Sequence, residues 1–586
     1  MRYLYTLTML LFVNILVGQA GSKIGGSLVD AMDMGDSHEV MVIMDDQVKL
    51  STTHLSTKAE KAEYVYTSLA QVAMRSQQDI GAYLDAKGVD FHSFNVVNAL
   101  SLTANNQLIR ELASRPDVRK VIHDPWFKVD LPVASKPLTS YRMADTTYGI
   151  KLIGADIVWE QGFTGQGVTV AGQDTGYDWD VDPLRSKYRG WNATDSTADH
   201  NYHWYDAIHE ISPLNNDSLP DPANNPCGVN SLEPCDDENH GTHTMGTMVG
   251  GTAENAIGVA PDANWIGCRS LERGWGKLST YTECFEFFLA PTDLQGQNPE
   301  PSLAPHVINN SWYCPAEEGC TPETWEVMEI VMFNLKASGV MIVVSAGNSG
   351  PTCGTIVAPP AIFNTAFTVG AVSEAELIAE FSSRGPVLID TVGVDSFVIA
   401  PHVVAPGVDV ISVVRNGVLR PNSGTSMSGP HVAGMVALMI SAVPELAGDP
   451  AAIEHTIMNT TKQKMSSQDC NDVMGQGVPN AVYGHGIVNV ADAVYSLIGV
   501  SSTEDIANAG DLLVYPNPTT GLLSFSTAEK ETITTVSIFD LSGRVVAVVS
   551  PRAEVATIDI SGFANGLYIY AAKTSKALYT GKVNKQ

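Results

Sequence analysis

Ser426 lies in the run of the sequence that most clearly suggests chemistry, residues 422–434. A serine hydroxyl is a weak nucleophile at neutral pH, so a catalytic serine needs a neighbouring base and hydrogen-bond donors for the oxyanion. Small residues before Ser426 allow close backbone approach, and the apolar residues after it predict a buried helix whose positive N-terminal end faces the serine. The run marks Ser426 as a candidate nucleophile, although taken alone it fits an ordinary helix N-cap equally well.

Three further runs contain the groups that such a serine needs. His240 comes directly before a stretch of small residues that predicts a helix, and Asp174 ends an apolar strand at a turn. A histidine base needs a carboxylate partner that fixes its tautomer and stabilises the imidazolium ion. Asn348 ends a second apolar strand, where its side-chain amide can donate to a developing oxyanion. The sequence therefore contains a candidate base, its carboxylate partner and an oxyanion donor.

Two of these runs have plainer explanations when each is taken alone. Asn348 and the two residues after it would form an ordinary turn. His240 and His243 are three residues apart and could bind a metal ion, but no glutamate lies between them and no third ligand is evident. A general base is therefore the better interpretation of His240.

Taken together, the four runs resemble the signature motifs of the subtilase family of serine peptidases, and they occur in the order typical of subtilisin. The resemblance implies that Asp174 orients the imidazole and that His240 acts first as a general base and then as an acid. It implies that Ser426 attacks the scissile carbonyl. It also implies an oxyanion hole formed by Asn348 and the backbone amide of Ser426.

The resemblance extends from residues 148–150 to residues 483–489, within a catalytic domain predicted at residues 147–500, and implies where a substrate would bind. The substrate-binding residues would form two walls, which are Ser311, Trp312 and Tyr313 on one side and Ser345, Ala346 and Gly347 on the other. Tyr313 stands where the family usually has glycine, so its specificity should differ from that of subtilisin. Residues 200–207 and 283–291 resemble the bacillopeptidase F branch of the family.

A loop with alternating carboxylates suggests a metal site outside the chemistry. Asp178, Asp180 and Asp182 have the oxygen ligands that calcium prefers, and many subtilases bind calcium for stability. Solvated loop carboxylates are the more common explanation of such a pattern. Structural calcium is therefore an option, while the chemistry itself needs no cofactor or metal. The resemblance gives His243 and His431 structural roles.

The elements that position these residues alternate between strands and helices. Nearly all-apolar strands are predicted at residues 167–173 and 340–345, as expected when helices cover both faces of a sheet. This predicts an α/β fold with a doubly wound, mostly parallel sheet, which binds ligands at the carboxyl ends of its strands. The apolar stretch 432–443 is too short to span a membrane and predicts a core helix.

The N-terminal part of the chain predicts a leader and a small α+β domain. Residues 1–20 have the positive start, apolar core and small-residue cleavage site of a signal peptide. Residues 21–140 predict the order β-α-β-β-α-β, with a long helix at 59–84. This domain resembles the inhibitor-type propeptide of subtilases, which templates folding and then blocks the cleft, and we expect cleavage between residues 127 and 146. A permanent ligand-binding domain is the alternative.

The C-terminal part predicts a separate all-β domain. A polar linker at about residues 500–510 precedes six β-type segments separated by turn signals, which predict a sandwich over residues 510–586. The block resembles the type IX secretion sorting domain through its motifs at 514–521, 539–544 and 566–568. A carbohydrate-binding or adhesion sandwich would share the fold, but such domains usually have exposed aromatic pairs that this sequence does not show.

Charge and cysteine content restrict the partners and the compartment. The 586 residues carry a formal net charge of -30, so nucleic acid and anionic lipid are poor partners. An even number of cysteines, eight, behind a signal peptide favours disulfides, and we expect the close pairs Cys227 with Cys235 and Cys314 with Cys320. Buried free thiols fit an oxidising compartment less well, and no pair has the two-residue spacing of a zinc knuckle.

The sequence therefore predicts a secreted serine endopeptidase that is made as a zymogen and that hydrolyses proteins through an acyl-enzyme on Ser426. We expect it to be extracellular or attached to the cell surface, and to be a monomer. Its expected partners are protein or peptide substrates, its own propeptide and the type IX secretion machinery.

A surface adhesion protein with the same fold would be expected to have a broken triad, and none of the four catalytic positions is substituted. A processing protease with one dedicated substrate stays open beside a broad scavenger enzyme.

Overall fold

The computed structural model describes residues 23–129, 131, 146–214, 225–252, 255–314, 320–391, 394–498, 512–527, 530–539, 545–574 and 578–586. The chain divides into two compact units, Met1–Val494 and Tyr495–Gln586. The predicted signal peptide, the predicted linker at 500–510 and most of the expected cleavage region lie outside the described residues.

The N-terminal domain is built on a four-stranded antiparallel sheet in the order β2-β3-β1-β4, and it confirms the predicted succession of elements. Its elements are α2 (Gly26–Met34), β1 (His38–Met44), α3 (Lys58–Ser76), α4 (Gln78–Lys87), β2 (Phe91–Phe94), β3 (Ala99–Ala104), α5 (Asn106–Ser114) and β4 (Val118–His123). Alternate residues of β1 lie in two different cores. Val40 and Val42 pack with α2, α4 and α5, whereas Met41 and Ile43 belong to the core of the following domain. Both faces of this sheet are therefore buried.

Two features of this domain differ from the expectation. The helix predicted at 59–84 is interrupted at Gln77, because the Gln77 side chain is buried and its Nε2 donates to the Phe94 carbonyl and the Asn98 side chain. Helix α2 was not predicted, because it has no N-capping side chain of its own. The Glu323 carboxylate accepts hydrogen bonds from the backbone N–H of Gly26 and Ser27 instead, and this partner lies far along the chain.

A seven-stranded sheet forms the centre of the second domain and confirms the predicted α/β fold. All its neighbouring strands are parallel, in the order β19-β16-β15-β14-β6-β12-β9. Its strands are β6 (Thr169–Asp174), β9 (Trp204–Asp206), β12 (Asn264–Arg269), β14 (Val307–Asn310), β15 (Met341–Ser345), β16 (Phe367–Val372) and β19 (Val403–Pro406). Parallel strands of this kind need helices on both faces of the sheet.

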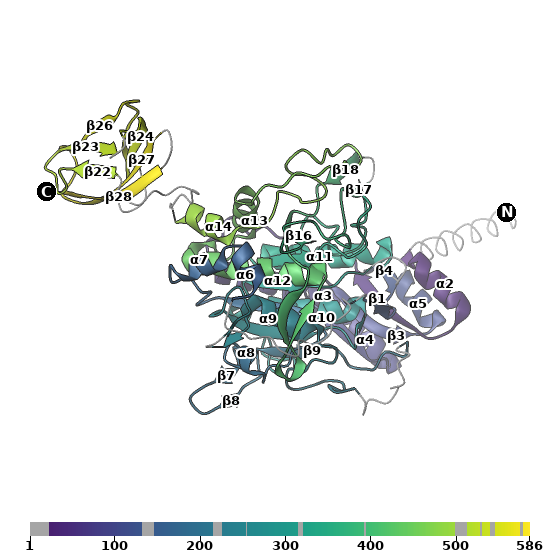
Figure 1. Ribbon diagram of the computed structural model, residues 1–586. Coiled ribbons are helices and arrows are strands. Elements are labelled where there is room, and N and C mark those ends of the chain that lie inside the picture. Colours follow the sequence, from purple (N-terminus) through teal and green to yellow (C-terminus); the bar gives the residue numbers. More distant parts are fainter. Residues whose placement is uncertain are drawn as a thin grey trace, which may run out of the picture. The chain divides into compact units, whose positions relative to one another are not determined.

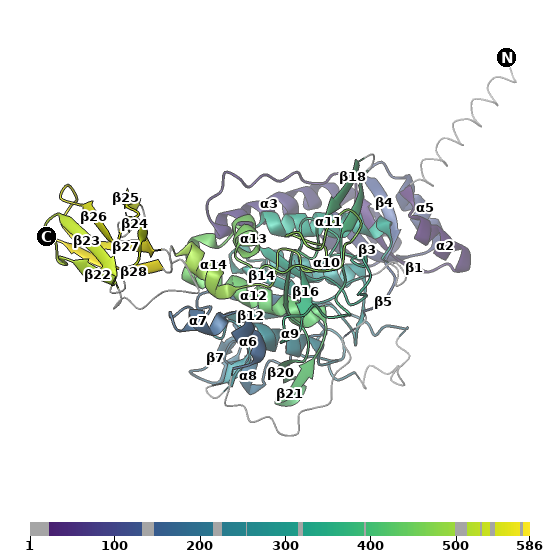
Figure 2. The same cartoon turned by 45° about the horizontal axis from the view of Figure 1, so that its top comes forward.

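Four long helices cover the sheet, two on each face. They are α9 (His240–Val249), α10 (Leu278–Leu289), α11 (Pro322–Ala337) and α12 (Thr425–Ala442). Ile308 of β14 packs in the core formed with α10 and α11, while the next residue, Asn309, faces Gly429 of α12. Because side chains alternate along a strand, α12 lies on the opposite face from α10 and α11. The N-terminal domain, drawn in purple, packs against α10 and α11 (Figures 1 and 2).

Shorter elements complete this unit. They are β5 (Phe127–Lys128), α6 (Tyr148–Leu152), α7 (Ala155–Trp159), α8 (Asp182–Arg185), β7 (Trp191–Asn192), β8 (Thr197–Ala198), β10 (Gly251–Thr252), β11 (Asn255–Ala256), β13 (Trp275–Gly276), β17 (Val387–Thr391), β18 (Val394–Val398), β20 (Val410–Val414), β21 (Val418–Asn422), α13 (Pro450–Asn459) and α14 (Val490–Leu497). The apolar stretch from Val432 to Ile440 lies inside α12 and is fully buried, as predicted for a core helix. Among the described residues, no helix has the length and hydropathy needed to cross a membrane.

Four disulfides join all eight cysteines. The expected pairs Cys227–Cys235 and Cys314–Cys320 are confirmed. Two longer connections, Cys268–Cys284 and Cys353–Cys470, complete the set. The first of these ties β12 to α10, and the second ties the segment after β15 to a loop near the end of the unit.

The C-terminal unit is the predicted all-β domain, with two antiparallel sheets. Their orders are β22-β23-β26 and β25-β24-β27-β28. The strands are β22 (Leu512–Tyr515), β23 (Leu522–Thr527), β24 (Ile533–Phe539), β25 (Val545–Val549), β26 (Val555–Asp559), β27 (Gly566–Thr574) and β28 (Leu578–Lys585). Only β28 was not predicted as a strand, because lysine and glycine residues interrupt its apolar alternation, although Tyr579 and Val583 are buried.

Disulfides that close a long loop and those that close a short loop should contribute differently to the free energy of unfolding. Cys353–Cys470 closes a loop of 117 residues and Cys227–Cys235 one of 8 residues. By chain entropy alone the former contributes about 5 kcal/mol and the latter about 2.5 kcal/mol. In protein inactivated by Ser426→Ala, replacing both cysteines of the long connection by serine should lower the thermal midpoint more than the same change in the short one. Equal shifts measured by calorimetry would contradict the loop-length argument.

Candidate active site

Asp174 and His240 form a buried pair at the carboxyl ends of the central strands. Strand β6 ends at Asp174 and helix α9 begins at His240. The Nδ1 atom of His240 lies 2.7 Å from Oδ1 of Asp174, and the two side chains are 4% and 2% exposed. Because Nδ1 carries the hydrogen in this bond, Nε2 is left as the atom that can accept a proton.

The surroundings of His240 favour its protonated form. Burial alone would lower the pKa of the imidazole, but the charge and hydrogen bond of Asp174, with further contributions from Asp236 and Glu238, raise the pKa above its usual value. His240 is therefore a stronger base than an exposed histidine. In the described part of the chain its Nε2 atom has no hydrogen-bond partner.

The two segments that carry this pair approach each other closely, and glycine allows the approach. A Cβ atom on Gly241 would collide with the backbone carbonyl of Gly176. Gly176 itself has a φ of 98°, in the left-handed region that favours glycine, and its own Cβ would collide with Cys235. The glycines in the two predicted motifs therefore set the distance between the carboxylate and the imidazole.

Ser426 stands in the first turn of α12, which begins at Thr425. Its hydroxyl donates to the Ser311 carbonyl across 3.1 Å, and the Ser311 hydroxyl donates back to the Ser426 carbonyl across 2.8 Å. The serine hydroxyl therefore does not donate to His240 in this structure. Hydrogen bonds of a catalytic group are often formed only once substrate is bound, so this geometry is compatible with a nucleophile.

Asn348 is held by its amide oxygen, which leaves its amide hydrogens available. The oxygen accepts hydrogen bonds from the backbone N–H of Thr425 at 2.9 Å and from the Thr425 hydroxyl at 3.0 Å. Since the oxygen is fixed next to the residue that precedes Ser426, the NH₂ group is the free donor of this side chain. The loop after β15 thus brings an amide donor beside the start of α12.

The two predicted substrate walls begin where β14 and β15 end. Ser311 is buried and contacts Ser426 as described above, whereas Trp312 is turned inward and is 1% exposed. The backbone N–H of Ala346 donates to Val369, and that of Gly347 donates to the Thr425 hydroxyl, while Ser345 is buried. Tyr313 is half-buried and is engaged with a neighbouring group. Trp312 is therefore covered in this structure, in a core that also contains Phe127 and Val129 of the N-terminal segment.

A segment of the N-terminal domain, residues 127–129, pairs with β13 of the catalytic domain. Strand β5 pairs antiparallel with β13, and the backbone N–H of Val129 donates to the Gly274 carbonyl across 2.8 Å. Phe127 stacks on Tyr281 with ring centroids 5.5 Å apart, and Tyr281 stacks on Trp312 at 3.6 Å. The N-terminal chain thus binds the catalytic domain as an added β-strand with an aromatic anchor.

The suggested calcium loop contains its own cation. Arg185 lies 3.1 Å from both Asp180 and Asp182, and Asp178 accepts a hydrogen bond from the backbone N–H of Asn416 at 2.7 Å. In the ranges that the structure describes, no group of three or more histidine, cysteine, aspartate or glutamate side chains could hold a metal ion. An arginine paired with two of the three carboxylates does not fit a calcium site, so these residues are better explained as a salt-bridged loop.

The two other histidines of the motifs are packed inside the fold. Nε2 of His243 lies 3.0 Å from the carbonyls of Val410 and Arg420, and Nδ1 of His431 lies 2.8 Å from that of Met427. Burial lowers the pKa of His243 to about 3 and that of His431 to about 4. Both stay neutral at physiological pH, in keeping with the structural roles expected of them.

Two residues that connect the site were not predicted from the sequence. Thr175 and Asp236 link the loop after Asp174 to the start of α9, where Asp236 accepts hydrogen bonds from the backbone N–H of Glu238 and Asn239. An aspartate shortly before a predicted helix is a capping signal, and this signal could have identified Asp236.

Comparisons with known proteins agree with this geometry. The chain matches the family model described as "Subtilase family" over residues 165–486 and that described as "Secretion system C-terminal sorting domain" over residues 513–586. The second match confirms the predicted type IX sorting domain and indicates a secreted or cell-surface protein.

Individual relatives cover different shares of the chain. Bacillopeptidase F of Bacillus subtilis is 32% identical over 457 residues, which are 75% of this chain and 29% of that protein. Serine protease AprX of the same species is 29% identical over 45% of this chain and 59% of its own length. Subtilisin E, also of Bacillus subtilis, is 27% identical over 66% of this chain and 82% of that protein. The chain thus spans less than two thirds of the first two relatives, but its central domain matches the family model throughout, and it belongs to the subtilase family.

Proposed function

We propose that this chain is a secreted serine endopeptidase that hydrolyses peptide bonds of proteins through an acyl-enzyme on Ser426. The observation that carries the proposal is the buried hydrogen bond between His240 and Asp174, which leaves Nε2 as a base at the start of α9. Helix α9 packs against α12, the helix that bears Ser426. A buried carboxylate that holds a histidine in one tautomer is what a serine nucleophile requires.

The reaction follows from the positions of these groups. Nε2 of His240 takes the proton of the Ser426 hydroxyl while Oγ attacks the carbonyl carbon of the scissile bond. The imidazolium ion is stabilised by Asp174 and then gives its proton to the leaving amine, so the peptide bond breaks and an ester remains on Ser426. A water molecule, deprotonated by the same imidazole, hydrolyses the ester and restores the serine. No metal or organic cofactor takes part in these steps.

The oxyanion of each tetrahedral intermediate needs fixed donors. The amide hydrogens of Asn348 supply one donor, since the amide oxygen is bound by Thr425. The backbone N–H of Ser426 supplies the other, and the N-terminal end of α12 adds a favourable dipole. Donors that are already held in place need little reorganisation when negative charge develops on the oxyanion, so they stabilise it at little cost in free energy.

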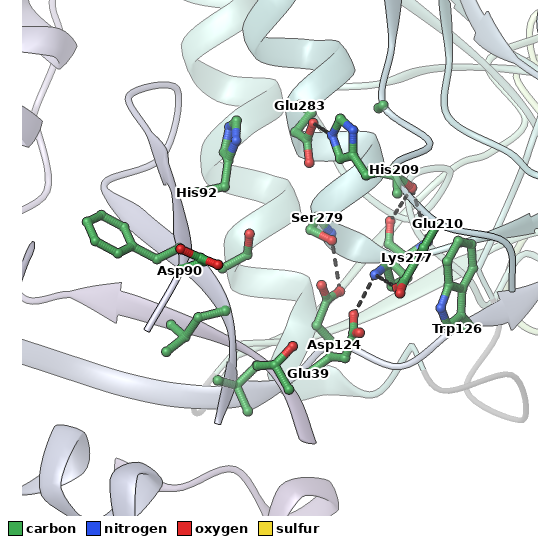
Figure 3. A pocket seen from close by; sticks show the side chains of 17 residues that line it. Glu39, Asp90, His92, Asp124, Trp126, His209, Glu210, Lys277, Ser279 and Glu283 are labelled. Carbon is green, nitrogen blue, oxygen red and sulfur yellow. Dashed lines mark hydrogen bonds and ion pairs between the residues drawn. The ribbon is translucent and has the colours of Figure 1, made fainter. Parts of the chain in front are cut away.

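The N-terminal domain, residues 21–140, acts in this proposal as an inhibitory propeptide. Strand β5 and Val129 pair with β13 and Gly274, where an extended substrate would also pair. A cavity of about 340 Å³ lies at the boundary between the two domains and is lined by side chains of both. Figure 3 shows these side chains. An inhibitor that binds through an added strand keeps substrate from the same edge.

Charged groups hold the propeptide at this boundary. Lys277 pairs with Glu39 of β1 and with Glu210 of the catalytic domain, at 2.5 and 2.8 Å (Figure 3). The Asp124 carboxylate accepts a hydrogen bond from the backbone N–H of Ser279, in the first turn of α10. In the opposite direction, Glu286 of α10 accepts hydrogen bonds from the backbone of the turn after β2. Each domain thus caps backbone groups of the other.

Export and maturation complete the proposal. Residues 1–20 would direct the chain across the inner membrane, and the C-terminal domain would direct it to the type IX secretion machinery. The substrate would be a protein or peptide and the enzyme a monomer. Both terminal domains would be removed to give the mature enzyme.

Substitution of the nucleophile tests the reaction. Ser426→Ala should reduce kcat for casein or peptide hydrolysis by several powers of ten, on the order of 10⁶-fold, because no other group can form the acyl-enzyme. Asn348→Ala should reduce kcat by about 10²–10³-fold through loss of one oxyanion donor. Ser441→Ala near the other end of α12 is the matched control and should leave kcat unchanged. Full activity of Ser426→Ala would refute the proposed function.

The pH dependence tests the role of His240. The base must be neutral, so kcat/KM should fall as pH decreases through the pKa of His240, which lies above the ordinary value of 6.5. Asp174→Asn removes the largest influence that raises this pKa, so the acidic limb should move to lower pH while the rate drops about 10⁴-fold. A limb that stays in place in Asp174→Asn would contradict the assignment.

Processing of the precursor tests the propeptide. Wild-type protein and Ser441→Ala should lose residues 21–140 as activity appears, whereas Ser426→Ala should keep them, because the cleavage is autocatalytic. Mass spectrometry of the N-terminus follows both forms. An active enzyme that still carries residues 21–140 would identify the domain as a permanent one.

A further inference from the structure

The Asp236 carboxylate connects the two segments that carry Asp174 and His240. It is 2% exposed and lies just before α9. Its Oδ1 atom accepts hydrogen bonds from the backbone N–H of Glu238 and Asn239, both at 2.9 Å. One buried carboxylate thus binds the backbone on the approach to the catalytic histidine.

The same carboxylate reaches the first turn of α9. Its Oδ2 atom accepts hydrogen bonds from the backbone N–H of Thr242 at 3.0 Å and from the Thr242 hydroxyl at 2.5 Å. The Thr242 hydroxyl in turn accepts a hydrogen bond from the backbone N–H of Asp178 at 2.9 Å. The backbone N–H of Thr242 is one of the groups that a helix start leaves without an intrahelical partner, so Asp236 helps to fix where α9 begins.

Thr175 links this network to the other half of the catalytic pair. Its hydroxyl donates to Oδ1 of Asp236 at 2.9 Å and accepts from the backbone N–H of Gly241 at 3.0 Å. Its own backbone N–H donates to Oδ1 of Asp174 at 2.7 Å, the oxygen that also binds His240. Asp236 is therefore bonded both to the helix of the imidazole and to the residue that holds the catalytic carboxylate.

We propose that Asp236 is a positioning residue of the hydrolytic reaction, which locks the loop after Asp174 to the start of α9 and thereby aligns His240 with Asp174. The proposal rests on the proposed function. Asp236 touches neither substrate nor the reacting atoms, so it acts only through the geometry and charge of its neighbours. Errors of about 1 Å in the placement of a catalytic group can cost about 10²-fold in rate, which is the scale on which such a residue matters.

The charge of Asp236 also acts on the imidazole. The groups that bear on His240 are Asp174, Asp236 and Glu238, whose charges raise its pKa, together with the neutral His243. Around Asp236 itself lie Asp237, Glu238 and the buried phenol of Tyr177. Burial raises the pKa of the Asp236 carboxyl, and hydrogen bonds from Thr242, Glu238 and Thr175 oppose this shift by favouring the charged form. Loss of the Asp236 charge should therefore lower the pKa of His240, in addition to any change in its position.

The experiment compares Asp236→Asn with Asp206→Asn, which replaces another buried carboxylate that accepts backbone hydrogen bonds, from Ile208 and Ser231. Asp236→Asn should lower kcat about 10- to 100-fold with KM little changed, and should move the acidic limb of kcat/KM to lower pH. Asp206→Asn should lower the thermal midpoint without either effect. Equal losses of kcat in the two variants would reduce Asp236 to a structural role and overturn the proposal.

A second pair of variants protects the test from a folding failure of Asp236→Asn. Thr175→Val removes the hydroxyl between Asp236 and Gly241 at nearly constant shape, and Thr175→Ser keeps it. Thr175→Val should therefore reproduce the loss of kcat expected of Asp236→Asn, whereas Thr175→Ser should have a kcat close to that of the wild type. Wild-type kcat in Thr175→Val would overturn the proposal.

A spectroscopic measurement separates this proposal from the proposed function. In Ser426→Ala protein, which needs no activity, the proton on Nδ1 of His240 should give a downfield NMR signal from its hydrogen bond to Asp174. Adding Asp236→Asn should shift or broaden this signal and lower the pH at which His240 titrates. An unchanged signal would overturn the positioning role even if the enzyme is a peptidase, and a changed signal would support it even if the proposed activity fails.

Discussion

The hydrogen bond between His240 Nδ1 and Asp174 Oδ1 is the interaction on which the rest of the site depends. Both side chains are almost completely buried, and a buried carboxylate is costly unless it is paired and hydrogen-bonded. The pair meets this condition because Oδ1 of Asp174 accepts hydrogen bonds both from the imidazole and from the backbone N–H of Thr175. The same burial that makes the pair costly also strengthens its electrostatic interaction, so the imidazole becomes a stronger base.

The contact between the N-terminal and catalytic domains has the character of a protein interior. Met41, Ile43 and Phe94 of the first domain lie in one core with the apolar faces of α10 and α11. Carboxylates from each side accept hydrogen bonds from the backbone of the other, with Glu286 and Glu323 from the catalytic domain and Asp124 from the N-terminal domain. The backbone N–H groups of these helix starts and turns would lack hydrogen-bond partners in either domain alone, and they find partners only where the two domains pack together. This arrangement suits a domain that templates the fold of the other.

Three features of the catalytic domain bear on its specificity and on the stability of a surface loop. Trp312 is buried against Tyr281, so an aromatic stack supports the cleft where Phe127 is anchored. Tyr313 brings a bulky side chain to a position where glycine is usual. In the loop of Asp178, Asp180 and Asp182, Arg185 lies within ion-pair distance of the last two carboxylates, and Asp178 accepts a hydrogen bond from the backbone N–H of Asn416. Differences in specificity and in loop stability would have their physical origin in these places.

The sequence by itself predicted the chemistry and determined the class of fold and most of the elements, because these follow from local patterns. An apolar strand, a glycine turn or a serine before an apolar helix can each be recognised within about ten residues of sequence. These local patterns identified the four candidate residues, Asp174, His240, Asn348 and Ser426. Tertiary structure alone decided the contacts between distant segments. The Glu323 carboxylate starts α2, Gln77 interrupts the predicted long helix, and Arg185 pairs with Asp180 and Asp182. The link that Asp236 makes between the segments of Asp174 and His240 also depends on tertiary structure. Its partner Thr175 lies 61 residues away in the sequence, and no local pattern joins the two residues.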